Sequence, residues 1–276
     1  MKSARVLVNG ELADQVSARD RGLAYGDGLF ESIRLIAGSA PLWSRHMQRL
    51  SESCTRLRMP LPDPAQLWRE VCRVTRGMPQ SVARITLTRG VGERGYAPPV
   101  SPQPTRVVAA FAPPPFLAEV YDEGLRLRVC DIRLAEQPLL AGMKHLNRLE
   151  QVLARAEWND PAIGEGVMCD SHGKVISATM ANLFAVVDGV LLTPALDRCG
   201  VAGVARAEVL ASRPEAITGE LTLDALLDAS EIFLTSSVRG VVPVKSLGGD
   251  DFTPGNTTRQ LQQHWRNLGF SMEQGE

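Results

Sequence analysis

Lys144 is the residue whose type and surroundings most clearly suggest chemistry. It lies in the segment Ala141–Glu150 (AGMKHLNRLE), just after a glycine. An apolar repeat with helical spacing follows, at Leu146, Leu149, Leu153 and Ala156. A lysine amine at the start of that predicted helix would lie near the positive end of the helix dipole and partly out of water, and both effects lower its pKa. The neutral amine is the form that reacts with carbonyl groups. Most lysines are solvated surface charges, however, and without further evidence Lys144 would be interpreted as one of them.

The glycine-rich segment Gly90–Tyr96 (GVGERGY) is a second candidate for function, because it follows a predicted strand. It holds a cation, Arg94, and an aromatic ring, Tyr96, between glycines. A mobile loop of this composition suits the capture of a carboxylate beside a ring. The alternative is a flexible hairpin tip whose polar side chains are incidental.

Hydrophobic periodicity predicts two halves of mixed structure, that is, an α/β (α+β) fold. The first half is expected to contain strands at residues 6–8, 30–36, 82–88 and 107–111, helices at 46–58 and 65–76, and a glycine-rich loop at 21–28. The second half is expected to contain strands at residues 125–129, 167–169, 175–176, 183–187, 190–193 and 232–235, a helix after Lys144 and another from near Gly203.

Two turn signals organise these elements. Asp188-Gly189 predicts a tight hairpin between two strands of the second half. The proline run Ala112–Pro115 predicts an extended, semi-rigid linker. The expected domains are therefore an N-terminal one at residues 1–112 and a C-terminal one at 120–276, joined by 113–119.

Composition limits the class of protein. The chain has 276 residues, of which 44% are hydrophobic and 22% charged, as in soluble globular proteins. A net charge of -1 with scattered basic residues gives no reason to expect nucleic acid or a membrane as a partner. The five cysteines contain no CxxC and the four histidines lie far apart, so neither a disulfide framework nor a metal site is expected. No leader or spanning segment is recognisable, and the default expectation is a cytoplasmic, metal-free protein.

The run Ala141–Leu153 (AGMKHLNRLEQVL) resembles the sequence around the cofactor-binding lysine of aminodeoxychorismate lyases. These enzymes are members of the fold-type IV family of pyridoxal phosphate enzymes, which also holds branched-chain and D-amino-acid aminotransferases. The likeness extends along nearly the whole chain, and the core KHLNRLE is specific to the lyase branch. The resemblance implies a two-domain fold-type IV structure, pyridoxal 5′-phosphate as the cofactor, and Lys144 as the catalytic residue that binds it.

The cofactor phosphate would need backbone donors, a helix N-terminus and an arginine. The segment Gly200–Arg206 opens a predicted helix, and Gly203 lets its backbone approach an anion closely. The resemblance assigns the amides of Val204 and Ala205 to the phosphate. From the residues alone, an ordinary N-terminal glycine explains the segment about as well.

Two further segments resemble phosphate-binding parts of the family. The turn Thr235–Val238 is similar to its second phosphate-binding turn, which implies the hydroxyl of Ser237 and the amide of Val238 as donors. Arg49 lies in the pattern H-x-x-R-L, whose arginine meets the phosphate in the family. A commonplace serine-rich turn and a solvated arginine are the alternatives.

The resemblance also implies substrate-binding residues. The stretch that ends in Arg94 and Tyr96 is similar to the G-x-G-x-R-G-Y stretch of the lyases. The segment from residue 21 to residue 31 matches the loop and strand that line the pocket in the family, so Tyr25, Phe30 and Arg34 are further candidates.

Ser177 departs from the family pattern. The family places a glutamate against the pyridine nitrogen of the cofactor, and Ser177 stands at that position, five residues before Asn182-Leu183-Phe184. A carboxylate stabilises a protonated ring, which makes the cofactor a strong electron sink, whereas a hydroxyl can only donate a hydrogen bond to a neutral nitrogen. We therefore expect Ser177 to contact the cofactor and transamination to be poor.

The function implied by the resemblance is the conversion of 4-amino-4-deoxychorismate to 4-aminobenzoate and pyruvate, within 4-aminobenzoate and folate biosynthesis. The expected partners are a small-molecule substrate, a second copy of the chain in a homodimer, and a transient contact with aminodeoxychorismate synthase. One alternative is a fold-type IV aminotransferase for D-amino or branched-chain amino acids, which the shape of the Thr235–Val238 turn favours. Another is a non-catalytic or altered paralogue, which Ser177 favours.

Overall fold

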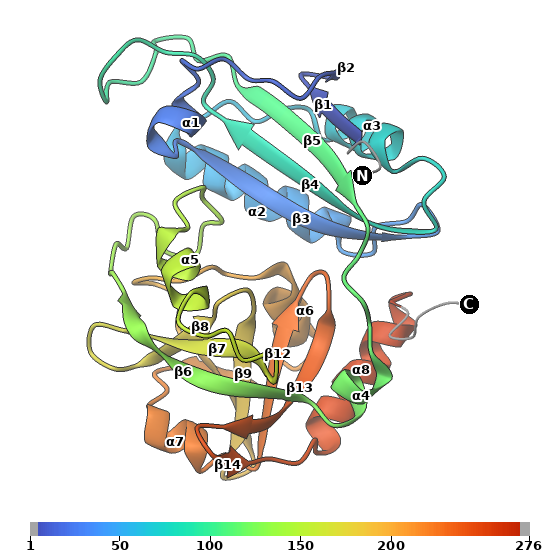
Figure 1. Ribbon diagram of the computed structural model, residues 1–276, viewed down its shortest axis with the longest axis vertical. Helices are drawn as coiled ribbons and strands as arrows, with labels where there is room; N and C mark the ends of the chain where they lie inside the picture. Colours follow the sequence, from blue (N-terminus) through green and yellow to red (C-terminus); the bar gives the residue numbers. More distant parts are fainter. Residues whose placement is uncertain (1–4, 271–276) are drawn as a thin grey trace. The chain divides into compact units, whose positions relative to one another are not determined.

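The computed structural model describes residues 5–270 and divides into two compact units (Figure 1). The first unit holds the described residues up to Pro114 together with Met143–Asn147. The second holds Pro115–Gly142 and the described residues from Arg148 onward. The segment around Lys144 thus belongs to the first unit, whereas the sequence predicts one C-terminal domain over the whole of 120–276.

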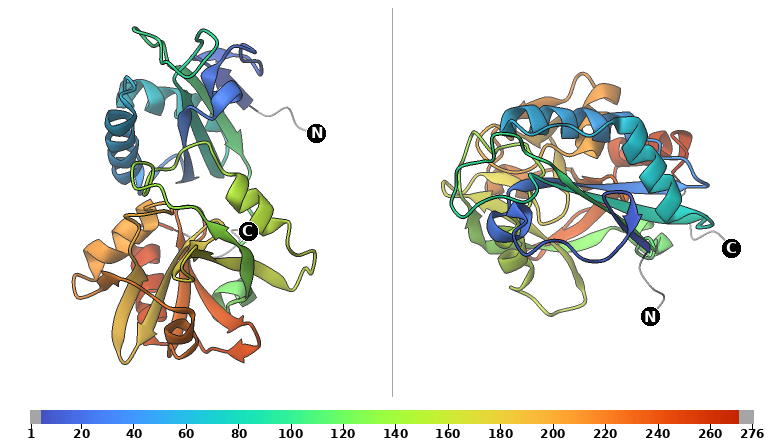
Figure 2. Two further views of the ribbon diagram at one scale, coloured as in Figure 1. Left: turned by 90° about the vertical axis from the view of Figure 1, so that its left-hand side faces the viewer. Right: turned by 90° about the horizontal axis from the view of Figure 1, so that it is seen from above.

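The first unit is built on a five-stranded antiparallel sheet. Its strands, in spatial order, are β2 (Glu11–Leu12), β1 (Arg5–Val8), β5 (Thr105–Phe111), β4 (Gln80–Thr88) and β3 (Gly28–Ile36). Two helices, α2 (Trp43–Leu57) and α3 (Pro64–Thr75), cover one face of this sheet (Figure 2). The strands and helices predicted for this half are confirmed, with boundaries moved by one to three residues.

The two faces of this sheet differ in character because side chains alternate along a strand. Leu29, Ile33 and Leu35 of β3 are buried on the face under the helices. Phe30 and Arg34 occupy the alternate positions and therefore point to the opposite face. The sheet thus carries an apolar face for its core and a face with aromatic and cationic side chains.

The predicted loop at residues 21–28 contains a short helix, α1 (Arg21–Tyr25). The side chain of Asp20 caps this helix by accepting a hydrogen bond from the amide of Gly22, at 2.8 Å. Gly26 ends it in the left-handed conformation, with φ at 66°. The cap at each end thus fixes one helical turn within the predicted glycine-rich loop.

The helix predicted after Lys144 is confirmed as α5 (Leu149–Arg155), but it begins five residues after the lysine. Residues 143–147 run antiparallel beside β3. Phe30 donates its amide to the carbonyl of Lys144 at 2.9 Å, and Leu146 donates to the carbonyl of Gly28 at 3.0 Å. β3 is the edge strand of its sheet, so it has backbone groups to pair. The helix-dipole argument for a reactive amine therefore does not apply.

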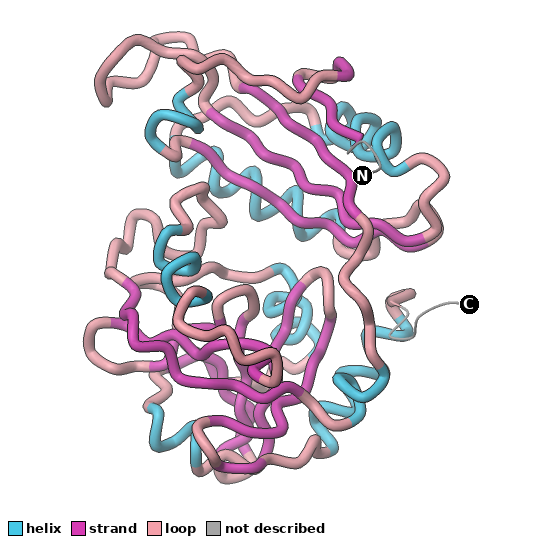
Figure 3. The backbone as a smooth tube through the Cα atoms, viewed as in Figure 1, coloured by secondary structure: helices cyan, strands magenta, loops and turns pink. Residues whose placement is uncertain are grey.

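The second unit is built on a nine-stranded mixed sheet (Figure 3). Its strands, in spatial order, are β11 (Ile217–Gly219), β10 (Val190–Pro194), β9 (Asn182–Val187), β12 (Glu231–Ser236), β13 (Gly240–Leu247), β6 (Leu125–Leu134), β7 (Ile163–Asp170) and β8 (Val175–Ala178), with β14 (Asp250–Asp251) beside β13. Its helices are α4 (Ala118–Asp122), α5, α6 (Val204–Ser212), α7 (Leu223–Leu227) and α8 (Asn256–Asn267).

The predicted hairpin at Asp188-Gly189 is confirmed, because it joins β9 to β10 and both residues have positive φ, at 50° and 78°. The rings of Phe184 on β9 and Phe233 on β12 stack in the core of the second unit, with centroids 5.1 Å apart. Within residues 5–270, no helix combines the length and the apolar character needed to cross a membrane.

Candidate active site

The side chain of Lys144 lies on the ring of Phe30. Its Nζ atom is 4.4 Å from the centre of that ring. An aromatic face attracts a cation through its quadrupole, so the ring helps to hold the amine in place. The lysine is half-buried. The pairing with β3 and the contact with Phe30 together position the backbone and the amine of the predicted catalytic residue.

A buried carboxylate organises the helix-covered side of β3. Glu31 binds two residues of α2, which lie one helical turn apart on the same face. The Nδ1 atom of His46 is 2.6 Å from Glu31 Oε2, and Arg49 donates from Nε to Oε1 at 2.9 Å and from Nη2 to Oε2. The side chains of Glu31 and His46 are fully buried, and that of Arg49 is nearly so. Arg49, predicted to meet a phosphate, is thus paired with a carboxylate in the structure.

The charges of this cluster determine which groups are ionised. Burial alone would raise the pKa of Glu31, but the Arg49 guanidinium and the His46 ring outweigh it and lower that pKa to about 2. Burial lowers the pKa of His46, as do the charges of Arg49 and Lys144, against the opposing effect of Glu31. The imidazole is therefore neutral near pH 7. Because a carboxylate only accepts, the ring proton sits on Nδ1 and is donated to Glu31.

The segment Gly90–Tyr96, predicted to be a mobile loop, is held by a buried arginine. Arg21 of α1 donates to the carbonyls of Gly95, Tyr96 and Ala97 at distances of 3.0, 3.0 and 3.2 Å. Its Nε also donates to Asp27 Oδ2 at 2.9 Å, which fixes the guanidinium from the other side. Arg21 is thus the centre of a polar network that defines the path of the loop.

The aromatic residues of this region lie together, while the arginine of the loop does not join them. The hydroxyl of Tyr25 accepts a hydrogen bond from the amide of Gly95 at 3.0 Å, and the rings of Tyr25 and Tyr96 are 5.5 Å apart. The side chain of Tyr96 is 87% exposed, and Arg94 is also exposed. Of the remaining predicted substrate residues, Phe30 is buried beside Lys144.

Arg34 is fully buried and donates from Nη2 to Gln80 Oε1 at 3.3 Å. It lies on the same face of β3 as Phe30 and Ser32, because these three residues occupy alternate positions of the strand.

In the second unit, the helix start predicted to bind an anion has no side-chain cap. Helix α6 begins after Gly203, and its first amides include those of Val204 and Ala205. Asn182 shapes the turn before it, because its amide donates to the carbonyl of Val201 at 2.9 Å and its oxygen accepts from Gly203 N at 3.0 Å. A side chain at Gly203 would collide with that oxygen. The turn therefore requires glycine, and the helix presents its positive end without a competing side chain.

The second predicted phosphate turn lies beside the first through the pairing of two strands. Thr235 of β12 pairs with Asn182 of β9, so their side chains share one face of the sheet. The hydroxyl of Thr235 is buried and has no hydrogen-bond partner among residues 5–270. Ser237 and Val238 follow in the turn between β12 and β13. Asn182 is thus the link between the two segments, and the sequence pattern offered no reason to single it out.

Gly142, two residues before Lys144 in the chain, is tied to the first of these turns. Its amide donates to the carbonyl of Gly200 at 3.0 Å, and its carbonyl accepts from Ala202 N at 3.0 Å. The backbone at Gly142 is therefore fixed by the turn that precedes α6.

Ser177 is buried on β8, opposite Met168 of β7. A second buried group, Glu165 on β7, accepts at its Oε1 from the amide and hydroxyl of Thr179 and from the amide of Gly166.

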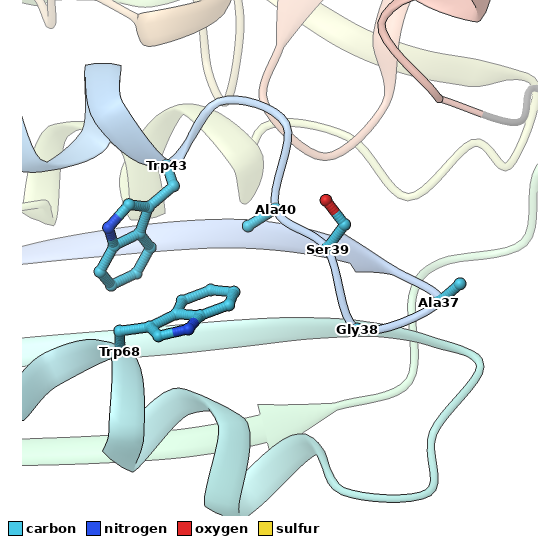
Figure 4. Close-up of a pocket in the computed structure, with 6 residues that line it drawn as sticks. All are labelled: Ala37, Gly38, Ser39, Ala40, Trp43 and Trp68. Carbon is cyan, nitrogen blue, oxygen red and sulfur yellow. The ribbon is translucent and has the colours of Figure 1, made fainter. Parts of the chain in front are cut away.

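A surface hollow of about 390 Å³ lies elsewhere on the first unit (Figure 4). It is bounded by the rings of Trp43 and Trp68, which meet edge to face at 4.9 Å, and by the turn Ala37–Ala40. None of the predicted site residues lines it, and it contains no ionisable side chain. We interpret it as a surface depression at the boundary between α2 and α3.

Comparison with known proteins gives the family of this chain. The family model described as amino-transferase class IV matches residues 28–247. The chain belongs to this family. It is 38% identical to an aminodeoxychorismate lyase of Vibrio harveyi over 92% of this chain and 97% of that protein. It is 31% identical to a putative branched-chain-amino-acid aminotransferase of Methanocaldococcus jannaschii over 96% of both chains.

A solved structure agrees with these sequence matches. The crystal structure of 4-amino-4-deoxychorismate lyase from Pseudomonas aeruginosa superposes with a TM-score of 0.91 and 45% identity, over 95% of this chain and 98% of that one. The fold class and the family predicted from the sequence are confirmed. Members of this family use pyridoxal 5′-phosphate, so the predicted cofactor is confirmed as well.

The residues present fit that cofactor chemically. An aldehyde needs a primary amine, which Lys144 supplies. A phosphate needs backbone donors, and α6 begins without a capping side chain. The buried hydroxyl of Thr235, without a partner among the described residues, is a further donor close to the same turn.

We expect the Glu31 cluster to make stability depend on pH in the acid range. The carboxyl has a lower pKa in the folded chain, about 2, than its ordinary value of 4.5, so it stabilises the fold above 4.5 and loses that contribution as the pH falls towards 2. The amount is on the order of 3 kcal/mol. The free energy of urea unfolding of the native chain should therefore exceed that of Glu31→Gln at neutral pH, and the gap should close on acidification. Glu52→Gln, at an exposed position of α2, is the control. A constant gap would contradict this account.

We expect Arg21→Gln to loosen the loop that carries Arg94. The native guanidinium donates to three loop carbonyls, and losing about 1.4 kcal/mol of this stabilisation makes an open loop about tenfold more populated. Limited digestion with trypsin, followed by mass spectrometry of the peptide that ends at Arg94, measures the change. Arg19→Gln is a matched control, because Arg19 contacts Glu93 of the same loop in an exposed salt bridge. Equal cleavage rates in the native chain and Arg21→Gln would show that Arg21 does not hold the loop.

Proposed function

We propose that this chain is a pyridoxal phosphate-dependent lyase that converts 4-amino-4-deoxychorismate to 4-aminobenzoate and pyruvate. The observation that carries the proposal is the segment KHLNRLE, whose lysine lies on the ring of Phe30 at 4.4 Å. The similarity to lyases of Vibrio harveyi and Pseudomonas aeruginosa over nearly the whole chain supports it.

Lys144 performs the proton transfers in this proposal. The bound cofactor supplies an electron sink for the carbon that carries the substrate amine. Lys144 Nζ would hold the cofactor through its aldehyde. As a neutral amine, Lys144 would take the proton from the ring carbon that carries the substrate nitrogen. Breaking the C–O bond to the enolpyruvyl group makes the ring aromatic, and Lys144 returns a proton to the leaving group, which becomes pyruvate.

The phosphate is assigned to donors from three segments. The amides of Val204 and Ala205 lie at the uncapped start of α6, and the hydroxyl of Ser237 and the amide of Val238 lie in the turn after β12. Arg49 has five N–H donors, of which Glu31 accepts those of Nε and Nη2. In this assignment Glu31 and His46 orient the guanidinium. Ser177 donates a hydrogen bond to the ring nitrogen.

The substrate is assigned to the loop and strand residues of the first unit. Arg94 orients a carboxylate and Tyr96 lies beside the ring, as their place in the GERGY stretch suggests. Tyr25 supports both, because its hydroxyl accepts from the amide of Gly95. Phe30 and Arg34, which lie on the face of β3 opposite the helices, are assigned to the same pocket in this proposal.

A homodimer, a cytoplasmic location, a place in folate biosynthesis and a transient contact with aminodeoxychorismate synthase belong to the same proposal. For the dimer, α5 offers one supporting feature. The side chains Leu149, Val152 and Leu153 share one helical face and are 75%, 60% and 58% exposed. Adjacent large apolar side chains with this much exposure are typical of a surface that binds another protein. The molecular mass of the chain in solution tests this part, and a monomeric mass would exclude the dimer.

A fold-type IV aminotransferase is the second candidate. The relative of Methanocaldococcus jannaschii, at 31% identity, favours it. Ser177 argues against it, because a hydroxyl cannot hold the proton on the cofactor ring by charge. Turnover of D-alanine or of a branched-chain amino acid with a 2-oxo acid would decide for this candidate.

Lys144→Ala should abolish the lyase reaction. Losing both the covalent anchor and the proton carrier should lower the rate by about a thousandfold or more. The measurement is the release of 4-aminobenzoate from 4-amino-4-deoxychorismate. In parallel, borohydride reduction of the native protein with its cofactor should label Lys144, as mapped by mass spectrometry. Lys174→Ala is the control, because Lys174 forms a salt bridge with the exposed Glu220. Native rates in Lys144→Ala, or an unlabelled Lys144, would refute the proposal.

Ser177→Glu should restore a carboxylate to the position where the family has one. We expect transamination of D-alanine to increase, because the ring nitrogen would keep its proton, and the lyase rate to be at least that of the native chain. Because Ser177 is buried, Ser177→Ala is measured beside it to separate the charge from the change in packing. A glutamate variant that binds the cofactor normally but is slower in the lyase reaction would contradict our explanation of Ser177.

A further inference from the structure

We propose that Asp27 is a positioning residue for the substrate, because it holds the loop of Arg94 through Arg21 and joins that loop to the end of α2 through Arg89. The inference deepens the proposed function and rests on it for the identity of the substrate. It gives a role to a carboxylate between α1 and β3 that the motif pattern does not mark.

One oxygen atom of Asp27 accepts hydrogen bonds from two arginines. Arg21 donates from Nε to Oδ2 at 2.9 Å, and Arg89 donates from Nε to the same atom at 2.7 Å. The side chains of Arg21, Asp27 and Arg89 are only 5%, 15% and 9% exposed, so little water competes for these contacts. Burial alone would raise the pKa of Asp27, but the hydrogen bonds and charges of Arg89 and Arg21 outweigh it and lower that pKa. The group is therefore a carboxylate at neutral pH.

The two arginines depend on this carboxylate for their close approach. Their Nε atoms lie no further apart than the sum of the two distances to Oδ2. Two guanidinium groups at that separation repel each other unless an anion lies between them. Removing the charge of Asp27 thus has a larger effect than the loss of two hydrogen bonds, because it also drives the two cations apart.

Arg21 transmits the effect of Asp27 to the substrate loop. Its Nη atoms donate to the carbonyls of residues 95–97, directly after Arg94. The loop approaches Arg21 so closely that a Cβ atom added at Gly92 would lie 2.9 Å from Arg21 Cδ. A shift of the Arg21 side chain therefore changes the path of the backbone that carries Arg94.

Arg89 transmits the effect of Asp27 to α2. Its Nη1 and Nη2 atoms donate to the carbonyls of Arg58 and Leu57, at 3.2 and 3.0 Å. These carbonyls lie at the C-terminal end of α2, where a cation is favoured by the helix dipole. The backbone amide of Arg89 also donates to the carbonyl of Asp27 at 3.0 Å. The substrate loop and the helix that carries Arg49 therefore share one anchor.

This anchor bears on substrate binding more than on the chemical step. A loop that is already ordered binds its ligand more tightly than a loose one, because less conformational freedom is lost on binding. Asp27 does not touch the substrate in this inference. It acts through Arg21, and Arg94 makes the contact.

The first test follows the loop itself in Asp27→Asn, which keeps the shape of the side chain and removes its charge. Limited digestion with trypsin should release the fragment that ends at Arg94 about tenfold faster than in the native chain. Adding Asp27→Asn to Arg21→Gln should change the cleavage rate of Arg21→Gln by less than about twofold, because residues that act through one another are not additive. Asp14→Asn, at an exposed position, should behave like the native chain.

The second test separates binding from chemistry in the lyase reaction. Asp27→Asn should raise KM for 4-amino-4-deoxychorismate by about tenfold and change kcat by about twofold or less. A variant that merely folds poorly lowers kcat and leaves KM unchanged, and circular dichroism identifies it. Asp27→Glu, which keeps the charge but displaces it by one methylene, should give an intermediate cleavage rate and KM. If Asp27→Asn does not fold, Asp27→Glu carries the test, and native values there would overturn the inference.

The outcomes distinguish this inference from the proposed function. A native cleavage rate in folded Asp27→Asn, or fully additive effects of Asp27→Asn and Arg21→Gln, would overturn the role of Asp27. Faster cleavage with a native KM would also overturn it, because the loop would then be loosened without consequence for the substrate. If the native protein has no lyase activity but the two substitutions are non-additive in the digestion, the link from Asp27 to the loop stands and the proposed substrate fails.

Discussion

The pairing of residues 143–147 with the open edge of β3 is the interaction on which the candidate site depends. An edge strand presents unpaired amides and carbonyls, and the chain around Lys144 satisfies them at Phe30 and Gly28. Because the backbone of Lys144 is hydrogen-bonded, its side chain has a defined direction and reaches the ring of Phe30. A lysine held in this way is positioned by a strand and an aromatic ring, and not by a helix terminus.

The first unit distributes its charges by pairing buried arginines with buried carboxylates. Glu31 holds Arg49, Asp27 holds both Arg21 and Arg89, and Glu70 holds Arg106. Breaking such a pair leaves an uncompensated charge in a poorly solvated place, which is costly. These pairs therefore fix the positions of the paired side chains more than they add to the stability of the fold. The Asp27 pairs fix the loop of Arg94, and the Glu31 pair fixes an arginine suited to a phosphate.

The second unit supplies backbone donors for an anion, and Asn182 is the residue that arranges them. Its side chain shapes the turn before α6, and its strand neighbour Thr235 leads into the turn of Ser237. A short polar side chain between two loops thus links the two segments that we propose as donors to the phosphate. We expect Ser177, on β8, to weaken the electron sink without disturbing this framework. A lyase whose product is aromatic tolerates such a change better than a transaminase does.

The sequence by itself determined the family, the cofactor, nearly all strands and helices of the first unit, and the hairpin at Asp188, because these depend on local periodicity, turn residues and short motifs. It predicted a helix after Lys144, and α5 confirms it, but only the tertiary structure shows that residues 143–147 pair with the edge of β3, more than a hundred residues earlier in the chain, before that helix begins. The partners of Arg21 and Arg49 are likewise set by segments that are distant in the chain. Local patterns specify elements, whereas the pairing of those elements specifies which charges meet.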